Sequence, residues 1–314
     1  MKVDVVLCTF NGERFLAAQL ESIERQSRRP DRVLVFDDGS SDGTLHVLEA
    51  FAARLPLTVS VNPVRLGPSG NFSQALSHAD GDIVFLCDQD DVWRPRKVQL
   101  MLDALASQPG AMLVCGDAGL IDAEGRRLSG SLLMRLGAQA AWSLPAAQLL
   151  ELLLRRNVVT GATSAVRRRL LDAALPVPAG YWHDEWLALV AAACEGIAWA
   201  DGILTDYRLH GGNAAGVDDV GALALARSLG VDARSFQRGK ALKLARLAGV
   251  VRTLDGLALR SHVATIEAAA AHWRARAERP AWGQGRLAAI RSASSRGEYR
   301  RFAAGWRSAL RDLF

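Results

Sequence analysis

The sequence predicts an α/β fold, in which a mainly parallel sheet is flanked by helices. The chain has 314 residues, of which 50% are hydrophobic and 23% charged, as is typical of globular proteins. In its first part, short apolar runs of strand length alternate with segments whose apolar residues recur at helical spacing. Strands that alternate with helices in this way form right-handed βαβ units.

Five strands and four helices follow from this alternation. The predicted strands are residues 3–9, 32–36, 57–61, 83–87 and 111–115. The predicted helices are residues 13–27, 44–53, 69–79 and 93–106, with a turn at 39–43. The carboxyl ends of parallel strands meet at one edge of a sheet, where α/β proteins bind ligands. Functional residues are therefore expected in the loops after the strands.

The pattern is less regular in the rest of the chain. The expected elements are helices at 144–155 and 184–194, an extended segment at 158–166, and two short strands within 197–208 around Asp201 and Gly202. Beyond Gly216 the chain is rich in Ala, Leu and Arg, and we expect helices with breaks near Gly230, Pro280 and Gly297. This divides the chain into residues 1–216 and a helical C-terminal region, 217–314.

Charge is distributed unevenly along the chain. Residues 221–314 contain 18 Lys and Arg against 6 Asp and Glu, whereas the whole chain has a net charge of +5. A basic segment favours an anionic partner, and an anionic membrane surface reached through the C-terminal helices is a candidate. The Arg residues lack interleaved aromatic residues, so nucleic acid is not an expected partner.

Membrane-spanning and secreted classes are not expected. No apolar stretch reaches the roughly 20 residues of a membrane span, and no signal peptide is recognisable. The four cysteines, Cys8, Cys87, Cys115 and Cys194, stand singly in apolar segments, which argues against a zinc site or a disulfide framework. We expect a cytoplasmic protein, with peripheral attachment at the inner face of the cell membrane as a candidate.

An acidic cluster follows the predicted strand at 83–87. Asp88, Asp90 and Asp91 lie within four residues, and their mutual repulsion adds nothing to stability. Oxygen-rich clusters of this kind bind Mg²⁺ or Mn²⁺ together with phosphate oxygens of a substrate. A solvated turn that caps the next helix is the alternative, but one aspartate would suffice for that. The position after a buried strand favours the divalent cation.

The turn at 36–44 is also acidic. Ser41 or Asp42 can cap the following helix, but capping does not account for Asp37 and Asp38 at the strand end. A carboxylate there can accept hydrogen bonds from a pyrimidine or a ribose hydroxyl.

The loop at 8–13 has one glycine and lacks the G-x-G-x-x-G motif of dinucleotide-binding sites. The Walker motif G-x-x-x-x-G-K-[ST] occurs nowhere in the chain. Both kinds of nucleotide site are therefore excluded.

Two histidines, His183 and His210, lie in segments that could take part in catalysis or in metal binding. His183, Asp184 and Glu185 open a predicted helix among three aromatic residues. They could cap the helix, or supply a general base beside a platform for a sugar ring. His210 ends a predicted strand before two glycines, where it could ligate a metal, touch a phosphate or be an ordinary surface residue.

Taken together, seven motifs resemble those of the inverting family 2 glycosyltransferases of the GT-A fold, close to the rhamnosyltransferase-like branch. They are CTFNGE at 8–13, FDDGSSDGT at 36–44, NPVRLGPSGNF at 62–72, CDQDDVW at 87–93, TGATSAVRR at 160–168, HDEW at 183–186 and YRLHGGN at 207–213. Each motif alone is weak, but seven in the family's order are specific. The resemblance covers residues 3–216 and implies a GT-A catalytic domain at 1–216, with nucleotide-sugar binding in 1–117 and the acceptor side in 118–216.

The resemblance also implies roles for individual residues. The donor-binding residues would be Thr9, Asn11, Glu13, Asp38, Asn71 and Asp88. The metal-binding residues would be Asp88, Asp90 and His210. Asp184 stands where these enzymes carry the catalytic base, and His183 replaces the Glu that commonly precedes it. No motif is carried over beyond Gly216.

The implied reaction moves a sugar from a nucleoside diphosphate to a hydroxyl of a glycan or lipid-linked glycan in cell-surface polysaccharide synthesis. The donor would be dTDP- or UDP-linked, and rhamnose is the first candidate for the sugar. A single displacement needs one carboxylate to take the proton and a divalent cation, Mg²⁺ or Mn²⁺, to neutralise the leaving diphosphate.

Two alternative functions stay open. A sugar-phosphate nucleotidyltransferase would have a Gly-rich basic loop after the first strand, which 8–13 lacks. A non-catalytic subunit that binds a nucleotide sugar or a glycan is the other.

Overall fold

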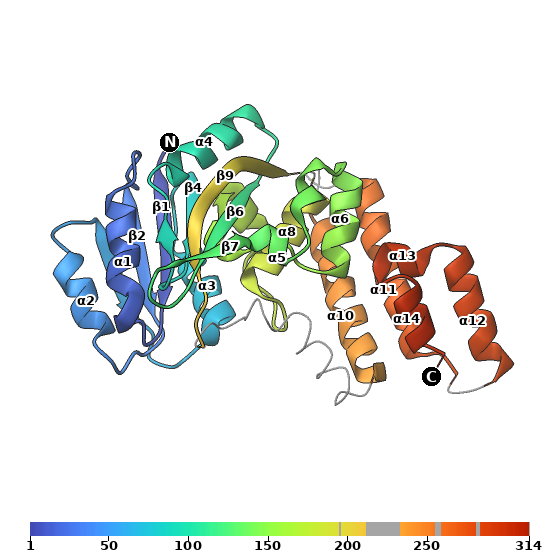
Figure 1. Ribbon diagram of the computed structural model, residues 1–314. Coiled ribbons are helices and arrows are strands. Elements are labelled where there is room, and N and C mark those ends of the chain that lie inside the picture. Colours follow the sequence, from blue (N-terminus) through green and yellow to red (C-terminus); the bar gives the residue numbers. More distant parts are fainter. Residues whose placement is uncertain (195, 212–232, 255–258, 281–282, 314) are drawn as a thin grey trace. The chain divides into compact units, whose positions relative to one another are not determined.

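A computed structural model describes most of the chain, in two compact units (Figure 1). The described residues are 1–194, 196–211, 233–254, 259–280 and 283–313. Of these, the first unit comprises 1–139, 158–191 and 196–211, and the second comprises 140–157, 192–194 and those from 233 onward. The predicted boundary at residue 216 lies outside the described residues, as do Gly212, Asn213 and Gly230.

One mixed sheet organises the first unit. Among the described residues it has nine strands in the order β3-β2-β1-β4-β8-β6-β9-β5, with β7 beside β6. The strands are β1 Val3–Thr9, β2 Arg32–Asp37, β3 Leu57–Val61, β4 Ile83–Cys87, β5 Val92–Trp93, β6 Leu113–Ile121, β7 Arg127–Ser131, β8 Ser164–Arg167 and β9 Ile197–Arg208. β1 to β4 are parallel, as predicted, and β6 is parallel to β9, whereas β8 runs antiparallel to both of its neighbours.

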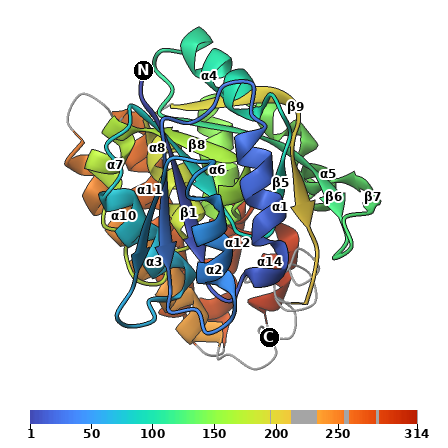
Figure 2. The same cartoon turned by 90° about the vertical axis from the view of Figure 1, so that its left-hand side faces the viewer.

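Helices cover both faces of the parallel part of this sheet. α1 (Glu13–Glu24), α2 (Thr44–Phe51) and α4 (Lys97–Ser107) bury apolar side chains against one face. α3 (Gly67–Ser77) lies on the opposite face from α1 and α2 (Figure 2). The shorter helices are α5 Leu132–Arg135, η1 Gln139–Ser143, η2 Gly161–Thr163 and α7 Arg168–Ala174, and α8 is His183–Ala193.

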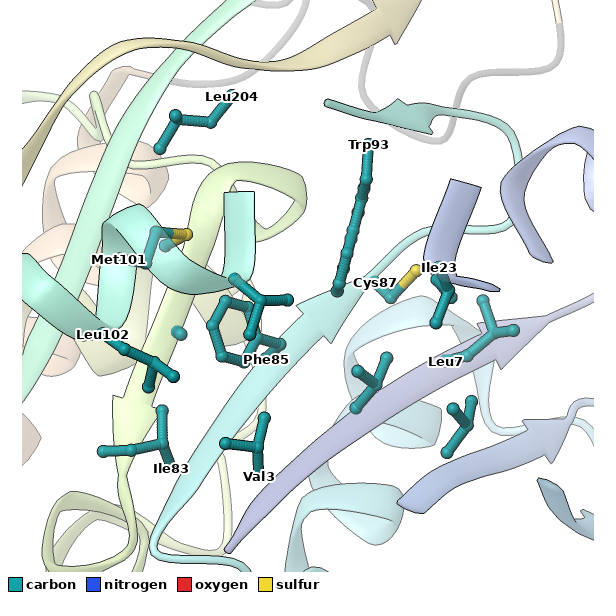
Figure 3. Packing of buried hydrophobic residues seen from close by; sticks show 14 of the residues in the cluster. Val3, Leu7, Ile23, Ile83, Phe85, Cys87, Trp93, Met101, Leu102 and Leu204 are labelled. Carbon is teal, nitrogen blue, oxygen red and sulfur yellow. The ribbon is translucent and has the colours of Figure 1, made fainter. Parts of the chain in front are cut away.

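The core of the first unit follows from the alternation of side chains along the strands. Val3 of β1 lies opposite Ile83 of β4, and Leu7 lies opposite Cys87, so that these side chains share one face (Figure 3). Each fully buried aliphatic side chain of this kind contributes about 1.5–3 kcal/mol. Because β1, β2 and β4 are held level by this register, the loops that follow them emerge at the same edge.

One predicted helix begins later than expected. The helix predicted at 93–106 starts at Lys97, and Trp93 lies in the short strand β5, where it pairs with Thr205 of β9. Pro95 disfavours helical backbone at the residue before it, which separates Trp93 from the helix. The apolar spacing that predicted the helix is correct only from Lys97 onward.

The segment 197–208 is one strand and not the two that were predicted. Gly202 has a φ of 96°, and the register with β6 shifts there, between Trp199 and Ile203. Asp201 and Gly202 therefore form a bulge in β9, which bends a strand without ending it. The predicted strand at 111–115 extends to Ile121 as β6, and the extended segment at 158–166 contains η2.

Helices form the second unit, as predicted for the C-terminal region. They are α6 Ala146–Arg155, α10 Ala233–Arg252, α11 Arg260–Ala277, α12 Gln284–Ser295, α13 Glu298–Phe302 and α14 Trp306–Arg311. α10 packs against α11 and buries Leu244, Leu247 and Val251. In the part of the chain that the structure describes, no helix is long and apolar enough to cross a membrane.

A buried ion-pair network links α11, the segment that follows it, and α13 to the residue after α14. Asp312 is 6% exposed and accepts hydrogen bonds from Arg276 Nε (2.7 Å), Arg279 Nη1 (2.6 Å) and the Tyr299 hydroxyl (2.6 Å). Burial alone would raise the pKa of Asp312, but hydrogen bonds from Arg276, Tyr299 and Arg279 hold it below its usual value. The carboxylate is thus the shared counter-charge of two buried guanidinium groups.

We expect Asp312→Ala to destabilise the second unit strongly, because two buried guanidinium groups lose their counter-charge, a change that costs about 3–5 kcal/mol in comparable sites. Chemical denaturation of the full chain, followed by tryptophan fluorescence, measures the free energy of unfolding. Asp172→Ala is the control, since Asp172 pairs with Arg168 at an exposed position and its loss should leave stability nearly unchanged. Equal effects of the two substitutions would contradict the importance of the network.

Candidate active site

The loop after β1 is fixed against the acidic turn after β4. The Phe10 N–H donates to Gln89 Oε1 (2.8 Å), and Gln89 Nε2 donates to the Phe10 carbonyl (3.0 Å). Gly12 lies so close that a Cβ there would be 2.3 Å from Gln89 Oε1. A larger residue at position 12 would therefore displace the Gln89 side chain that joins the two loops.

The loop after β1 is also bonded to the loop after β2. Thr9 lies opposite Asp37 in register, and Thr9 Oγ1 donates to Asp37 Oδ1 at 2.8 Å. Asn11 Oδ1 and Glu13 Oε2 each accept a hydrogen bond of 2.9 Å from backbone N–H groups of the turn at 39–43. Asn11 and Glu13 are exposed, whereas Thr9 is buried. Three of the predicted donor-binding residues thus lie together at the carboxyl edge of the sheet.

Asp38 and Asn71 are buried and bonded within the protein. Asp38 accepts hydrogen bonds from the N–H groups of Leu66 (2.7 Å) and Gly67 (2.8 Å) and from Asn62 Nδ2 (3.0 Å). Asn71 Nδ2 donates to a backbone carbonyl of β2 (2.8 Å), and Asn62 Nδ2 also donates to Asn71 Oδ1 (2.9 Å). These bonds hold the start of α3 against β2, and the predicted donor-binding role of both residues stays a prediction.

The carboxyl groups of the acidic turn lie close to one another, with Asp91 buried and Asp88 and Asp90 half-buried. Burial and the charges of Asp90 and Asp184 raise the pKa of Asp88 to about 7. Burial likewise raises the pKa of Asp91, whose Oδ1 accepts a hydrogen bond from the Arg208 N–H (2.9 Å). Asp91 Oδ2 is buried and has no hydrogen-bond partner among the described residues. Repulsion of this kind is relieved by a bound cation.

His210 lies against the acidic turn, although about 120 residues separate them in the chain. Its Nε2 is 2.8 Å from Asp90 Oδ2, and its ring lies 4.7 Å from that of Phe15. Arg208 Nε donates to the Asp90 carbonyl at 2.7 Å, and Arg208 Nη1 donates to the Asp122 carbonyl at 3.1 Å. Arg208 therefore holds the end of β9 and the acidic turn together.

Asp90 Oδ2 and His210 Nε2 lie at hydrogen-bonding distance, and the predicted role of both residues as metal ligands stays a prediction. No three His, Cys, Asp or Glu side chains in the described ranges form a cluster that could hold a metal. The predicted metal-binding role of Asp88 stays a prediction. Water and diphosphate oxygens would supply the other ligands, as they commonly do for Mg²⁺.

Asp184 lies at the start of α8, close enough for its charge to act on Asp88. Its Oδ2 accepts a hydrogen bond from the Gly161 N–H (3.1 Å), and its Oδ1 accepts one from the Glu185 N–H (2.6 Å). Burial raises the pKa of Asp184 to about 6, against the lowering effect of these bonds. A carboxylate with this pKa can take up a proton near neutral pH.

His183 lies next to Asp184 in the sequence but in an apolar environment. It is 6% exposed and stacks on Phe72 with ring centroids 3.9 Å apart. Neither ring nitrogen has a hydrogen-bond partner among the described residues, and burial lowers the pKa of His183 to about 3, so the ring is neutral. A Cβ at Gly161 would lie 2.8 Å from His183 Nε2, so glycine there permits this packing. The predicted catalytic role of His183 stays a prediction.

Three residues that organise this site are not identified by sequence reasoning. Gln89 lies inside the motif at 87–93 and Arg208 inside the motif at 207–213, so their places in these motifs could have identified them. Lys97 lies in no motif, and its signal in the sequence is that a lysine is unusual among the apolar positions of α4. It is fully buried, and its Nζ donates to the Ala162 carbonyl at 2.6 Å.

Known proteins resemble this chain in sequence. Residues 4–173 match the family described as Glycosyl transferase family 2. An uncharacterized glycosyltransferase of Nostoc sp. strain PCC 7120 is 26% identical over 229 residues, which cover 68% of this chain and 66% of the relative. The dTDP-rhamnosyl transferase RfbG of Shigella flexneri is 31% identical over 105 residues, 32% of this chain and 36% of that protein. The matched segments thus span about a third to two thirds of these relatives.

Solved structures share the fold. S. aureus TarS 1–349, in complex with UDP-GlcNAc, has a TM-score of 0.58 at 18% identity and covers 94% of this chain and 80% of its own. The mannosyltransferase PcManGT from Pyrobaculum calidifontis, in complex with GDP-Man and Mn²⁺, has a TM-score of 0.52 at 19% identity, with 94% and 75% covered. The predicted GT-A fold with a helical C-terminal region is confirmed. Because the family match includes more than half of the residues, from β1 into α7, the chain belongs to glycosyl transferase family 2.

Proposed function

We propose that this chain is an inverting, divalent-cation-dependent glycosyltransferase that moves a sugar from a nucleoside diphosphate to a hydroxyl group. The observation that carries the proposal is the grouping of half-buried carboxyl groups from two distant segments, Asp88, Asp90 and Asp184. Asp184 is bonded to backbone N–H groups, whereas Asp90 is paired with His210. The first arrangement suits a base, and the second suits a cation.

The proposed reaction is a single displacement. Asp184 would accept the proton of the acceptor hydroxyl while that oxygen bonds to the anomeric carbon and the bond to the diphosphate breaks on the opposite face. No covalent intermediate forms, so one carboxylate base suffices. Asp90 and His210 would hold Mg²⁺ or Mn²⁺, which supplies neutralisation of the negative charge on the diphosphate when bound.

The donor side of the site would be built from the loops after β1 and β2. Asn11 and Glu13 are exposed there and Thr9 lies beneath them, so they would line the nucleoside pocket. Asp88 would face the ribose. Asp38 and Asn71, which the protein's own hydrogen bonds already satisfy, would shape this pocket from behind.

The names of relatives support the substrate class. RfbG is named a dTDP-rhamnosyl transferase. Another relative, 30% identical over 104 residues, is the UDP-Glc:alpha-D-GlcNAc-diphosphoundecaprenol beta-1,3-glucosyltransferase WfgD of Escherichia coli. We therefore propose a dTDP- or UDP-linked donor, dTDP-rhamnose first. The acceptor would be a glycan or lipid-linked glycan used in cell-surface polysaccharide synthesis.

An assay of nucleoside diphosphate release tests the proposal. The donors are dTDP-rhamnose, UDP-glucose and UDP-N-acetylglucosamine, and each is assayed with Mn²⁺, Mg²⁺ or EDTA. We expect release from one donor that depends on the cation and falls by about 100-fold or more in Asp90→Ala, since a ligand is lost. Asp103→Ala, which removes an exposed carboxylate of α4, should leave release unchanged. Full release by Asp90→Ala, or by the unchanged chain in EDTA, would contradict the cation site.

A second set of variants tests the base. Asp184→Asn should lower kcat by about 100-fold or more, with little change in donor KM, because the proton acceptor is lost. For the unchanged chain, kcat/KM should fall as the pH drops through about 6, where Asp184 becomes protonated. His183→Ala should lower kcat less, since its ring is neutral and packed on Phe72. A larger loss in His183→Ala than in Asp184→Asn would assign the base to the histidine.

We further propose that α10 attaches the protein to an anionic membrane surface. Among the described residues, α10 exposes Phe236 (59%) and Leu242 (72%) and also carries Arg238, Lys240 and Lys243. Basic residues attract anionic lipid, while exposed apolar side chains can enter the headgroup region. The competing interpretation is a basic helix face that is simply solvated.

Co-sedimentation with vesicles tests this attachment. Replacement of Arg238, Lys240 and Lys243 by Gln should weaken binding to phosphatidylglycerol vesicles roughly 100-fold, at about 1 kcal/mol per residue. The matched control replaces three exposed arginines of the first unit, Arg25, Arg29 and Arg126. Neutral vesicles should bind neither chain. If the unchanged protein ignores anionic vesicles at low salt, the basic face is only solvated.

A further inference from the structure

The helix α14 of the second unit presents an exposed apolar face. Trp306 is 71% exposed and Leu310 is 48% exposed. Because the two residues lie four positions apart in α14, their side chains share one face of the helix. The indole of tryptophan is a large apolar group that proteins mostly bury. Exposed apolar side chains that lie together in this way are typical of a surface that meets a partner or a membrane.

The other side of α14 fixes the helix to the rest of the second unit. Ser308 is buried, and its Oγ accepts a hydrogen bond of 3.0 Å from the Ala304 N–H. Asp312, the residue after the helix, is the buried counter-charge of Arg276 in α11. α14 also packs against α12 and α13 (Figure 1). A helix of six residues is not stable alone, so these contacts determine where its exposed face points.

The charge around this face is mainly positive. Residues 283–313, which contain α12, α13 and α14, have seven arginines and only two acidic residues, Glu298 and Asp312. Glu298 pairs with an arginine, and Asp312 is buried in its network, so both negative charges are already compensated. Arg307 and Arg311 are exposed on α14 itself, next in sequence to the two apolar residues. The face therefore combines exposed apolar side chains with exposed positive charge.

An anionic membrane surface fits this combination better than a protein partner does. Arginines attract the phosphates of anionic lipid, and tryptophan is favoured in the headgroup region of a bilayer. A second copy of the chain that docked through the same face would bring Arg307 and Arg311 close to their own counterparts, and like charges repel. The charge of the face thus favours lipid over a second copy.

We infer that α14 is an insertion point at an anionic bilayer. Trp306 and Leu310 enter the headgroup region, and the arginines of the same helix contact the lipid phosphates. This inference rests on the membrane attachment proposed above for α10, and it adds a second contact from another helix of the same unit. The two contacts involve different residues, so each can be removed while the other is kept.

Quenching of tryptophan fluorescence by brominated lipid tests the insertion. The full chain is mixed at low salt with vesicles of phosphatidylglycerol and brominated phosphatidylcholine. We expect quenching in the unchanged chain and the loss of most of it in Trp306→Phe, which keeps an apolar side chain at this position. Trp182→Phe is the matched control, because it removes a tryptophan of the first unit that is 43% exposed, and it should keep the quenching.

Co-sedimentation with phosphatidylglycerol vesicles measures what the face contributes to binding. Replacement of both Trp306 and Leu310 by Ser should weaken binding by about 30-fold, because two apolar side chains no longer leave water. The Tm should stay unchanged, since both side chains are exposed. The matched control replaces Trp182 and Leu128 by Ser, because these are exposed apolar residues of the first unit, and it should bind as the unchanged chain does.

The outcomes separate this inference from the proposed attachment through α10. Quenching that survives in Trp306→Phe, or binding that is unchanged in the double Ser variant, would overturn the insertion of α14 and leave the role of α10 intact. An unchanged chain that ignores anionic vesicles at low salt would overturn both. If light scattering without vesicles gives a smaller mass for the double Ser variant than for the unchanged chain, the face binds a second copy and the inference is wrong.

Discussion

Repulsion among closely placed carboxyl groups is the constraint on which the architecture of this site depends. Asp91 is buried and Asp88, Asp90 and Asp184 are half-buried, so their charges are less screened than in water. Asp90 pairs with His210, Asp91 accepts a hydrogen bond from the Arg208 N–H, and Asp184 accepts hydrogen bonds from the Gly161 and Glu185 N–H groups. All of these partners except Glu185 are distant in the sequence, so the fold must bring them in from the end of β9 and from η2.

The register of the parallel strands makes this arrangement possible. β1, β2 and β4 end level, so that their loops meet, while the alternating apolar side chains beneath them form a continuous core. The opposite, amino-terminal edge also carries a buried carboxylate, Asp4, but there an ion pair with Arg32 and two backbone N–H groups hold it. The contrast between a neutralised edge and an acidic one agrees with the proposal that ligands bind at the acidic edge.

Local patterns predict those parts of the fold that depend on local interactions. The strands Val3–Thr9 and Ile83–Cys87 agree residue for residue with their apolar runs, because burial of such runs decides them. Leu57–Val61 also agrees with its run, although its side chains are half-buried or exposed. Trp93 does not follow its helical pattern because pairing with β9, a segment over a hundred residues away, is stronger.

The sequence likewise identifies some residues of the candidate site, whereas the roles of others are visible only in the structure. The motifs identify Asp90 and His210, which the fold brings within hydrogen-bonding distance. They place the base at Asp184, but they do not show that His183 beside it is packed on an aromatic ring. The hydrogen bonds that hold the first loop to Gln89 and to the turn at 39–43 are likewise visible only in three dimensions.

The order of these loops has a consequence for binding kinetics. If a nucleotide binds between loops that are already ordered, the protein backbone loses little conformational entropy on association. Differences in affinity among donors should then arise from their dissociation rates.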